Sequence, residues 1–179
     1  MFDQFYYLGT SFVSAWALNT RDGIILFDTL NNAEEAAQYI EGGLRRVGLD
    51  PARITYIVLT HGHADHFGGA KYLQEKYRAR VLMSAIDWNL VAAGAAAGTL
   101  RVAPPSRDIA IADGEKLSLG GTDISFHFTP GHTPGTMSAI IPVTGFQQNC
   151  SLIWDEASKV GAVVDPGGDL DLIERGIKE

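Results

Sequence analysis

The sequence predicts an α/β fold with a mixed sheet, formed by a single domain over residues 1–179. In the first hundred residues, segments with strand patterns alternate with segments of helical spacing. Between residues 108 and 128, three short strand-like segments follow one another with only Asp113-Gly114 and Gly120-Gly121 between them, which indicates antiparallel pairing. A chain of 179 residues, 46% hydrophobic and without a low-complexity linker, suits one domain better than two.

The chain begins with a predicted hairpin and helix. The apolar and aromatic residues of Gly9–Asp28 are interrupted by Arg21-Asp22-Gly23, a sequence typical of a hairpin turn. Asn32 precedes Glu35 by three residues, the spacing of a capping box, and opens a helix predicted over Ala33–Val47.

A buried strand and three further elements follow. Ile54–Thr60 is almost entirely apolar or β-branched, as expected of a strand covered on both faces. Ser84 and Asp87 have capping-box-like spacing at the start of the last of these elements. The three elements are predicted as helix, strand and helix: Phe67–Tyr77, Arg80–Met83 and Ile86–Ala97.

The second part of the chain is predicted to be rich in strands. It begins after a loop at Pro104–Ser106 and ends with a helix over Asp169–Ile177, which Asp169 caps. The strands are predicted at Asp108–Ala112, Glu115–Leu119, Thr122–Phe128, Met137–Val143, Ser151–Trp154 and Val160–Asp165.

Composition disfavours two classes of partner. With 14 basic and 21 acidic residues, the net charge of −7 repels nucleic acid. No run approaches the roughly 18 apolar residues of a membrane span, and the N-terminus lacks a signal-peptide pattern, so we expect a cytoplasmic protein without membrane contact. Because Cys150 is the only cysteine, any metal must be bound by histidines and carboxylates.

The strongest chemical signal is His61-Gly62-His63-Ala64-Asp65-His66, directly after the buried strand. In an extended segment His61 and His63 point the same way, and the turn into the next helix aims Asp65 and His66 at a neighbouring point. This geometry can serve two metal ions. The alternative is a set of histidines in a surface loop.

A second signal surrounds His132. The segment Thr129–Thr136 contains two prolines and two glycines that fix a loop after a strand, and it presents His132 rigidly. The alternative is a histidine that only stabilises the turn. His127 belongs to neither signal, because it lies on the strand face opposite Ile124 and Phe126, where we expect exposure.

The motif HGHADH followed by TPGHTPGT resembles the metallo-β-lactamase superfamily. Residues 5–143 are similar to its β-lactamase-like members, including Asp28 at a strand end. The resemblance implies an αββα sandwich with one or two zinc ions between the sheet edges. It also implies that His61, His63 and His132 hold one zinc, whereas Asp65 and His66 contribute to the second.

The end of the chain resembles a different branch of the superfamily. In glyoxalase II-like proteins, segments similar to FQQNCSLIW and VVDPGGD precede the histidine motif, whereas in residues 140–179 they follow it. We therefore expect a composite chain with a seam at 140–145 and a shortened or recombined second half.

The composite end bears on the second metal ion. By the resemblance, Asp165 is the best candidate for the aspartate that bridges two metals, with Asp169 second. The alternative for Asp165 is a structural role in its Asp-Pro-Gly-Gly turn. No histidine follows His132, so the second site lacks its final ligand.

The resemblance implies a zinc-dependent hydrolase acting on a small molecule. Three imidazoles leave an open zinc position, which lowers the pKa of bound water toward about 7 and yields a hydroxide nucleophile. Asp65 is expected to orient that water or take its proton. A β-lactam is the favoured substrate; a thioester, lactone or phosphodiester, or a metal-binding scaffold with little catalysis, are the alternatives. The shortened second half also predicts a homodimer that covers exposed apolar surface.

Overall fold

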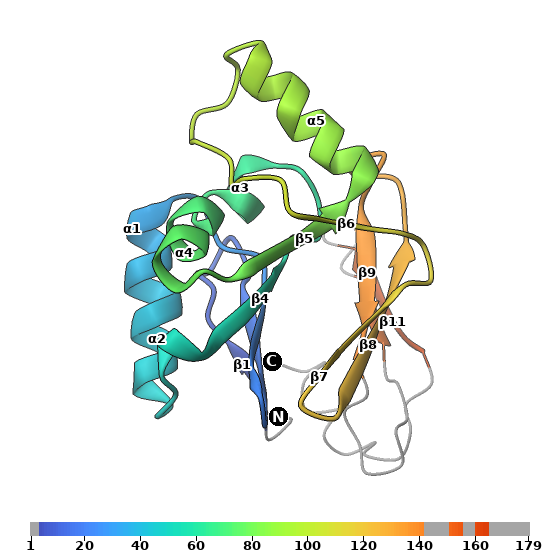
Figure 1. Ribbon diagram of the computed structural model, residues 1–179. Coiled ribbons are helices and arrows are strands. Elements are labelled where there is room, and N and C mark those ends of the chain that lie inside the picture. Colours follow the sequence, from blue (N-terminus) through green and yellow to red (C-terminus); the bar gives the residue numbers. More distant parts are fainter. Residues whose placement is uncertain (1–3, 142–150, 156–159, 165–179) are drawn as a thin grey trace.

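The computed structural model describes residues 4–141, 151–155 and 160–164. Two sheets face each other, one of six strands and one of three, and helices cover the outer face of the larger sheet (Figure 1). The order of helices, sheet and sheet provides three layers of the predicted sandwich. The predicted helix Asp169–Ile177, the candidate ligands Asp165 and Asp169, and most of the predicted seam lie outside the described residues.

The six-stranded sheet is mixed, as predicted. The order is β1-β2-β3-β4-β5-β6, with antiparallel pairing from β1 to β3 and parallel pairing from β3 to β6. The predicted hairpin is confirmed, because Thr20 pairs with Gly23 around the turn that joins β2 to β3. The strands are β1 Phe5–Tyr7, β2 Trp16–Thr20, β3 Gly23–Phe27, β4 Ile54–Val58, β5 Arg80–Ser84 and β6 Ile109–Ile111.

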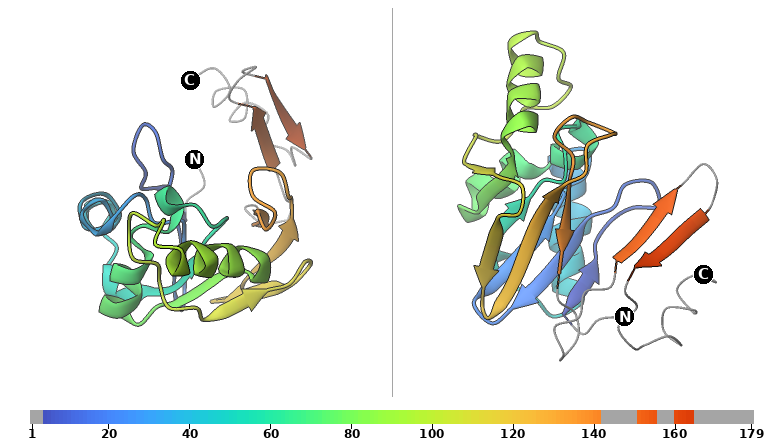
Figure 2. Two further views of the ribbon diagram at one scale, coloured as in Figure 1. Left: turned by 90° about the horizontal axis from the view of Figure 1, so that it is seen from above. Right: turned by 90° about the vertical axis from the view of Figure 1, so that its right-hand side faces the viewer.

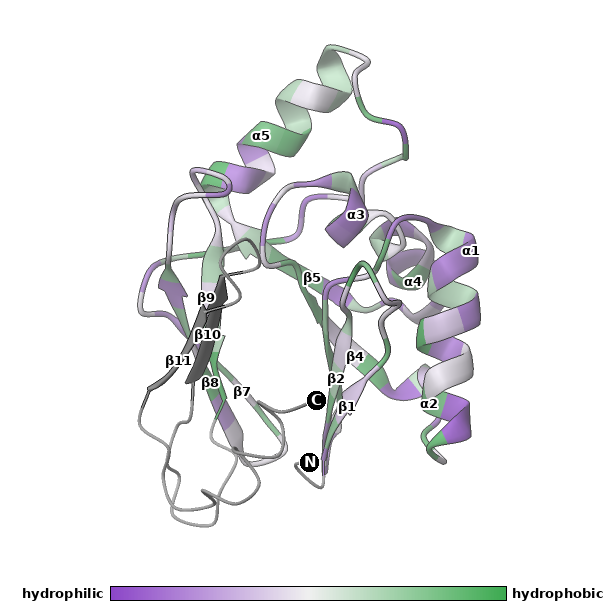
Figure 3. Ribbon diagram, turned by 180° about the vertical axis from the view of Figure 1, so that it is seen from behind, coloured by the Kyte–Doolittle hydropathy of each residue, from purple (hydrophilic) through white to green (hydrophobic). Residues whose placement is uncertain are grey.

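The first helix is interrupted by a wider turn. The run predicted over Ala33–Val47 consists of α1 Ala33–Glu35, the π-helix η1 Ala36–Glu41 and α2 Gly42–Arg46. Asn32 caps it, since its side chain accepts a hydrogen bond of 2.8 Å from the backbone N–H of Glu35. Hydrophilic and hydrophobic residues alternate around this run, whereas hydrophobic residues follow the neighbouring strands (Figure 3).

The remaining helices connect the parallel strands. They are the 3₁₀-helix η2 Pro51–Arg53, α3 Ala64–Phe67, α4 Ala70–Tyr77 and α5 Ala85–Ala96. The helix predicted over Phe67–Tyr77 is divided at Gly68, where a Cβ atom would lie 2.0 Å from the carbonyl oxygen of Asn31. The predicted cap of α5 is confirmed, because Ser84 Oγ accepts from the backbone N–H of Asp87 at 3.1 Å.

The prediction of three consecutive antiparallel strands is wrong for the first of them. Strand β6, predicted over Asp108–Ala112, pairs parallel with β5 and completes the larger sheet. The other two segments form the smaller sheet together with the next strand, as β7 Lys116–Leu119, β8 Thr122–Phe128 and β9 Met137–Ile140, all antiparallel. The long loop before β6 allows this strand to lie beside β5. The short turns that follow the strand in the sequence gave no sign of this pairing.

Strand β3 separates two apolar cores. Its alternate residues Ile24 and Leu26 pack with the helices, whereas Ile25 and Phe27 pack toward the smaller sheet. The first core includes the fully buried Leu73 of α4. The second joins the two sheets, and strand β8 contributes residues such as Phe126.

A separate hairpin follows the two sheets. Both strands predicted here are present, as β10 Ser151–Asp155 and β11 Val160–Val164, and they pair antiparallel to form a two-stranded sheet beside the others (Figure 2). Within the described ranges, no helix has the length and apolar character needed to cross a membrane.

Candidate metal centre

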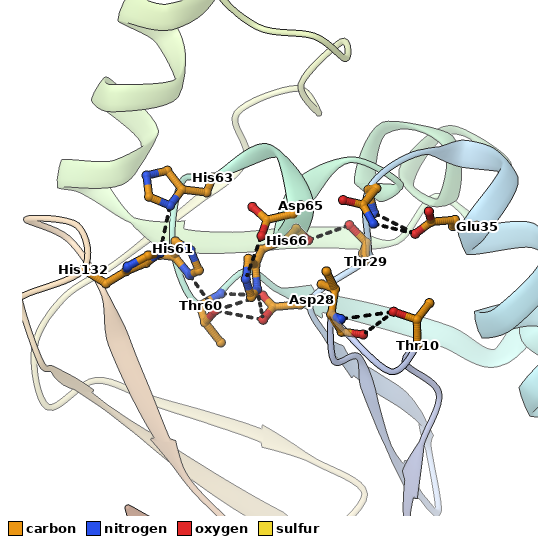
Figure 4. A network of polar contacts seen from close by, with 12 residues as sticks. Thr10, Asp28, Thr29, Glu35, Thr60, His61, His63, Asp65, His66 and His132 are labelled. Atoms are coloured by element: carbon orange, nitrogen blue, oxygen red, sulfur yellow. Dashed lines mark hydrogen bonds and ion pairs between the residues drawn. The ribbon is translucent and has the colours of Figure 1, made fainter. Parts of the chain in front are cut away.

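Five predicted site residues meet where strands of the two sheets end (Figure 4). The larger sheet supplies four of them, two from the loop after β4 and two from α3, and the smaller sheet supplies one from the loop between β8 and β9. They are His61, His63, Asp65, His66 and His132. The second sheet thus completes a cluster that the first sheet begins.

Three imidazoles surround a common point. One ring nitrogen from each of His61, His63 and His132 lies within 4.8 Å of the other two. The ring planes are nearly perpendicular, at 80° to 86°, with centroids 4.7 to 4.9 Å apart. His63 Nδ1 and His132 Nε2 are 3.0 Å apart. Two nitrogens on one tetrahedral zinc, each at ~2.05 Å, would be about 3.3 Å apart, so the spacing of this pair is close to what such an ion requires.

The orientation of His61 follows from its neighbours. The Thr60 hydroxyl donates to the carboxylate of Asp28, with 2.8 Å between Thr60 Oγ1 and Asp28 Oδ2. Thr60 Oγ1 can therefore accept from His61 Nδ1–H, 3.1 Å away. This tautomer leaves the lone pair of Nε2 free, and Nε2 is buried without a hydrogen-bond partner among the described residues.

The charge state of His61 suits a metal ligand. Burial, followed by the neighbouring His66 ring, lowers the pKa of His61 to about 4. The ring is then neutral at pH 7, as coordination of a cation requires. His61 therefore offers a buried, neutral and unpartnered nitrogen beside two other imidazoles, and the three rings together suit a zinc ion.

A second pair of candidate ligands lies beside the three histidines. His66 Nδ1 is 2.8 Å from Asp28 Oδ2, and His66 Nε2 is 3.6 Å from Asp65 Oδ2. Burial opposes protonation of His66, but the hydrogen bond and the charge of Asp28 raise its pKa overall. The centroids of the His61 and His66 rings are 4.0 Å apart. Asp28 therefore orients His66 directly and His61 through Thr60.

A cavity of about 520 Å³ opens beside this cluster. His63 and Asp65 line one part of it, and Asn31 together with residues 99–102 lines the rest. Arg101 is exposed and has no ion pair or hydrogen bond with any residue of the described ranges. A positively charged side chain is thus available to a molecule in the cavity.

One further residue was predicted correctly, and two residues near the site were not recognised from the sequence. His127 is exposed on β8, as predicted. Sequence reasoning gave Asp87 a capping role and did not notice Arg101. The spacing of Ser84 and Asp87 did identify the start of α5, but it carries no information about where the Asp87 carboxylate points.

Comparisons with known proteins agree with this geometry. Residues 8–142 match a family model described as the metallo-beta-lactamase superfamily. A hydroxyacylglutathione hydrolase of Pseudomonas savastanoi pv. phaseolicola is 40% identical over 83 residues, 46% of this chain and 26% of that protein. A probable metallo-hydrolase, YqgX, of Bacillus subtilis is 32% identical over 131 residues, 70% of this chain and 58% of that protein.

A solved structure is similar as well. It is a subclass B3 metallo-beta-lactamase of Bradyrhizobium japonicum, with a TM-score of 0.71 and 28% identity over 83% of this chain and 58% of that chain. The chain therefore spans between about a quarter and three fifths of the length of the proteins to which it is similar.

Proposed function

Because the chain belongs to the metallo-beta-lactamase superfamily, we propose that it is a zinc-dependent hydrolase of small molecules, with a β-lactam as the favoured substrate. One observation carries the proposal: His61 Nε2 is buried and unpartnered at the point where two further imidazoles converge. His61, His63 and His132 would hold the first ion. Three imidazoles match a catalytic zinc site with an open position.

Asp65 and His66 would contribute to a second ion. Their facing atoms, Asp65 Oδ2 and His66 Nε2, are 3.6 Å apart. Two ligands do not complete a site, so Asp165, which lies outside the described residues, remains the proposed bridging ligand. A bound zinc would supply Lewis acidity and lower the pKa of a coordinated water toward about 7.

Asp65 is the proposed catalytic residue of this chain. Its side chain is half exposed, at 49%, and lines the cavity beside His63. A carboxylate in this position can accept a hydrogen bond from the attacking water, orient it and take its proton. Asp28 assists indirectly, because its carboxylate holds His66 and Thr60 in place.

The cavity supports an anionic substrate. Its volume of about 520 Å³ lies in the usual range for small-molecule sites, roughly 300–1,000 Å³. Arg101, which also lines the cavity, would bind a carboxylate, as guanidinium groups do. A β-lactam carries such a carboxylate. The alternative thioester substrate is supported by the resemblance to a hydroxyacylglutathione hydrolase.

A metal-binding scaffold with little catalysis is the second candidate function. It is favoured by the incomplete second ligand set, which within the described residues consists of Asp65 and His66. Zinc content does not separate the two candidates, since both bind metal. Turnover does, because only the hydrolase converts substrate.

The test is hydrolysis of a chromogenic cephalosporin and, in parallel, of a glutathione thioester. We expect turnover by the zinc-loaded protein, none after chelation, and none in His61→Ala. His127→Ala is the matched control, because it removes an exposed imidazole of the smaller sheet outside the site. Full zinc occupancy without turnover of either substrate, or of a lactone or phosphodiester, would instead support the scaffold.

A further inference from the structure

Asp87, at the start of α5, is a fully buried carboxylate that the proposed chemistry does not use. Its two oxygens accept hydrogen bonds from three donors. Oδ2 accepts from the backbone N–H of Gly62 at 2.7 Å and from the hydroxyl of Thr133 at 2.6 Å. Oδ1 accepts from the backbone N–H of Gly135 at 2.9 Å.

These donors belong to the two histidine loops. Gly62 lies between His61 and His63 on the larger sheet, and Thr133 follows His132 on the smaller sheet. One carboxylate therefore contacts both loops. A backbone hydrogen bond of 3.0 Å, from the N–H of Met137 to the carbonyl oxygen of Thr60, also links them. That bond reaches a residue next to His61 but only the end of the His132 loop, whereas Asp87 contacts residues next to the ligands in both loops.

The chemistry of the contact requires a carboxylate. All three partners donate, and an ionised Asp accepts at both oxygens. An asparagine of the same shape would turn an NH₂ group toward at least one of these donors. That donor would be left buried without a partner, which is costly in the interior.

The backbone of the His132 loop lies very close to Asp87. A Cβ atom on Gly135 would lie 2.3 Å from Ser84 Oγ and 2.5 Å from Asp87 Oδ1. Only glycine lets this N–H approach the carboxylate so closely. Within the loop, Thr136 Oγ1 and Thr133 Oγ1 are 2.8 Å apart, so the Thr136 hydroxyl can donate to Thr133 while Thr133 donates to Asp87.

We propose that Asp87 is a positioning residue that holds the loop of His61 and His63 against the loop of His132, so that ligands from two sheets reach one metal ion. The inference rests on the proposed metal site and deepens it. Asp87 itself touches neither the ion nor the substrate. It acts through the backbone of Gly62 and through Thr133 and Gly135.

The test compares Asp87→Asn with Glu41→Gln. Glu41 is the matched control, since it is also a buried helical carboxylate, 3% exposed, but lies in the helical layer, where it pairs with Lys76 at 2.7 Å. Zinc affinity is measured by competition with a chromophoric chelator. The visible absorption spectrum of the cobalt(II)-substituted protein reports the ligand geometry, which a merely structural role would leave unchanged.

We expect Asp87→Asn to bind zinc about 10- to 100-fold more weakly and to alter the cobalt spectrum, as loss of a group that orients ligands does. Glu41→Gln should change zinc affinity by less than about twofold, because it is remote from the site. Equal affinity and unchanged spectra in Asp87→Asn and the wild type would overturn the proposal.

Thr133→Val covers the case in which Asp87→Asn does not fold. It removes one of the three donors and keeps the shape, so we expect zinc affinity to fall about two- to tenfold. Unchanged affinity in this variant would overturn the proposal. Failure of the wild type to bind zinc would overturn the proposed function together with this inference. If the wild type binds zinc and a folded variant binds it equally well, the inference alone is overturned.

Discussion

The two histidine loops differ in how the fold holds them. After β4, His61 is 5% exposed, and its ring is fixed through Thr60 by Asp28, which also holds His66. Between β8 and β9, His132 is exposed. Its loop is closed by hydrogen bonds of its own, such as Thr129 N–H to the Thr136 carbonyl oxygen at 2.9 Å.

The difference shows how a site divided between two sheets is assembled. The larger sheet and its helices provide a platform with four of the five ligands, of which His61 is buried and His63 is exposed. The smaller sheet brings one ligand, and its position depends on the core between the sheets and on Asp87. The metal site should therefore be most sensitive to changes that move the smaller sheet.

The largest expected effect comes from substitutions in the two apolar cores, which should differ in their effect on zinc binding. Phe126→Ala and Leu73→Ala should each destabilise the fold, by about 3–5 and 2–5 kcal/mol respectively, because both side chains are fully buried. Only Phe126→Ala should also weaken zinc binding, since Phe126 joins the two sheets and Leu73 packs among the helices. Denaturant unfolding and chelator competition measure the two quantities.

The proposed difference between the two histidine loops would be contradicted if Leu73→Ala weakened zinc binding as much as Phe126→Ala at equal loss of stability. In that case the platform, and not the junction of the sheets, would limit the affinity.

A smaller effect concerns pH and the buried ring of His61. The pKa of His61 is about 4 in the fold, below the ~6.5 of an unfolded chain. Above pH ~6.5 the ring is neutral in both states. As the pH falls from ~6.5 toward 4, the unfolded state binds the proton first, so the metal-free protein should lose about 3 kcal/mol of stability.

His66 acts in the opposite direction. Its raised pKa gives stability that is present below pH ~6.5 and is lost as the pH rises through the folded-state value. Urea unfolding of metal-free protein between pH 4 and 8 tests both. His61→Ala should remove the decline on the acidic side, and His127→Ala should retain it. If stability still declines at acidic pH in His61→Ala, other titratable groups cause the decline.

The smallest expected effect lies at the cavity. Arg101→Gln should raise KM for a carboxylate-bearing substrate severalfold and leave kcat nearly unchanged, because an exposed guanidinium binds the ground state and transition state alike. Arg101→Lys should retain part of the effect. The matched control is Arg107→Gln, whose guanidinium already pairs with Asn89 Oδ1 at 2.7 Å. An equal rise of KM in both variants would indicate a general charge effect.

Local patterns in the sequence predicted much of this molecule. Alternation of strand and helix placed β2 to β5 of the larger sheet but not β1, and the motifs HGHADH and TPGHTPGT contain the five residues that the fold brings together as the candidate metal site. Ser84 was identified as a cap because capping depends on residues three positions apart.

Features that depend on distant partners were not predicted. The Asp87 carboxylate contacts Gly62 and Gly135, and nothing in its own neighbourhood along the chain indicates that direction. The pairing of β6 with β5 depends on the path of a long loop. Likewise, Arg101 is one charged loop residue among several until the fold places it at the cavity.

The central claim is that ligands from two sheets share one metal ion, and X-ray absorption at the zinc edge tests it most directly. For wild-type protein loaded with one zinc ion per chain we predict three imidazole ligands at ~2.0–2.1 Å. His132→Ala should lose one imidazole and His127→Ala none. An unchanged imidazole count in His132→Ala, or sulfur ligation by Cys150, would contradict the account.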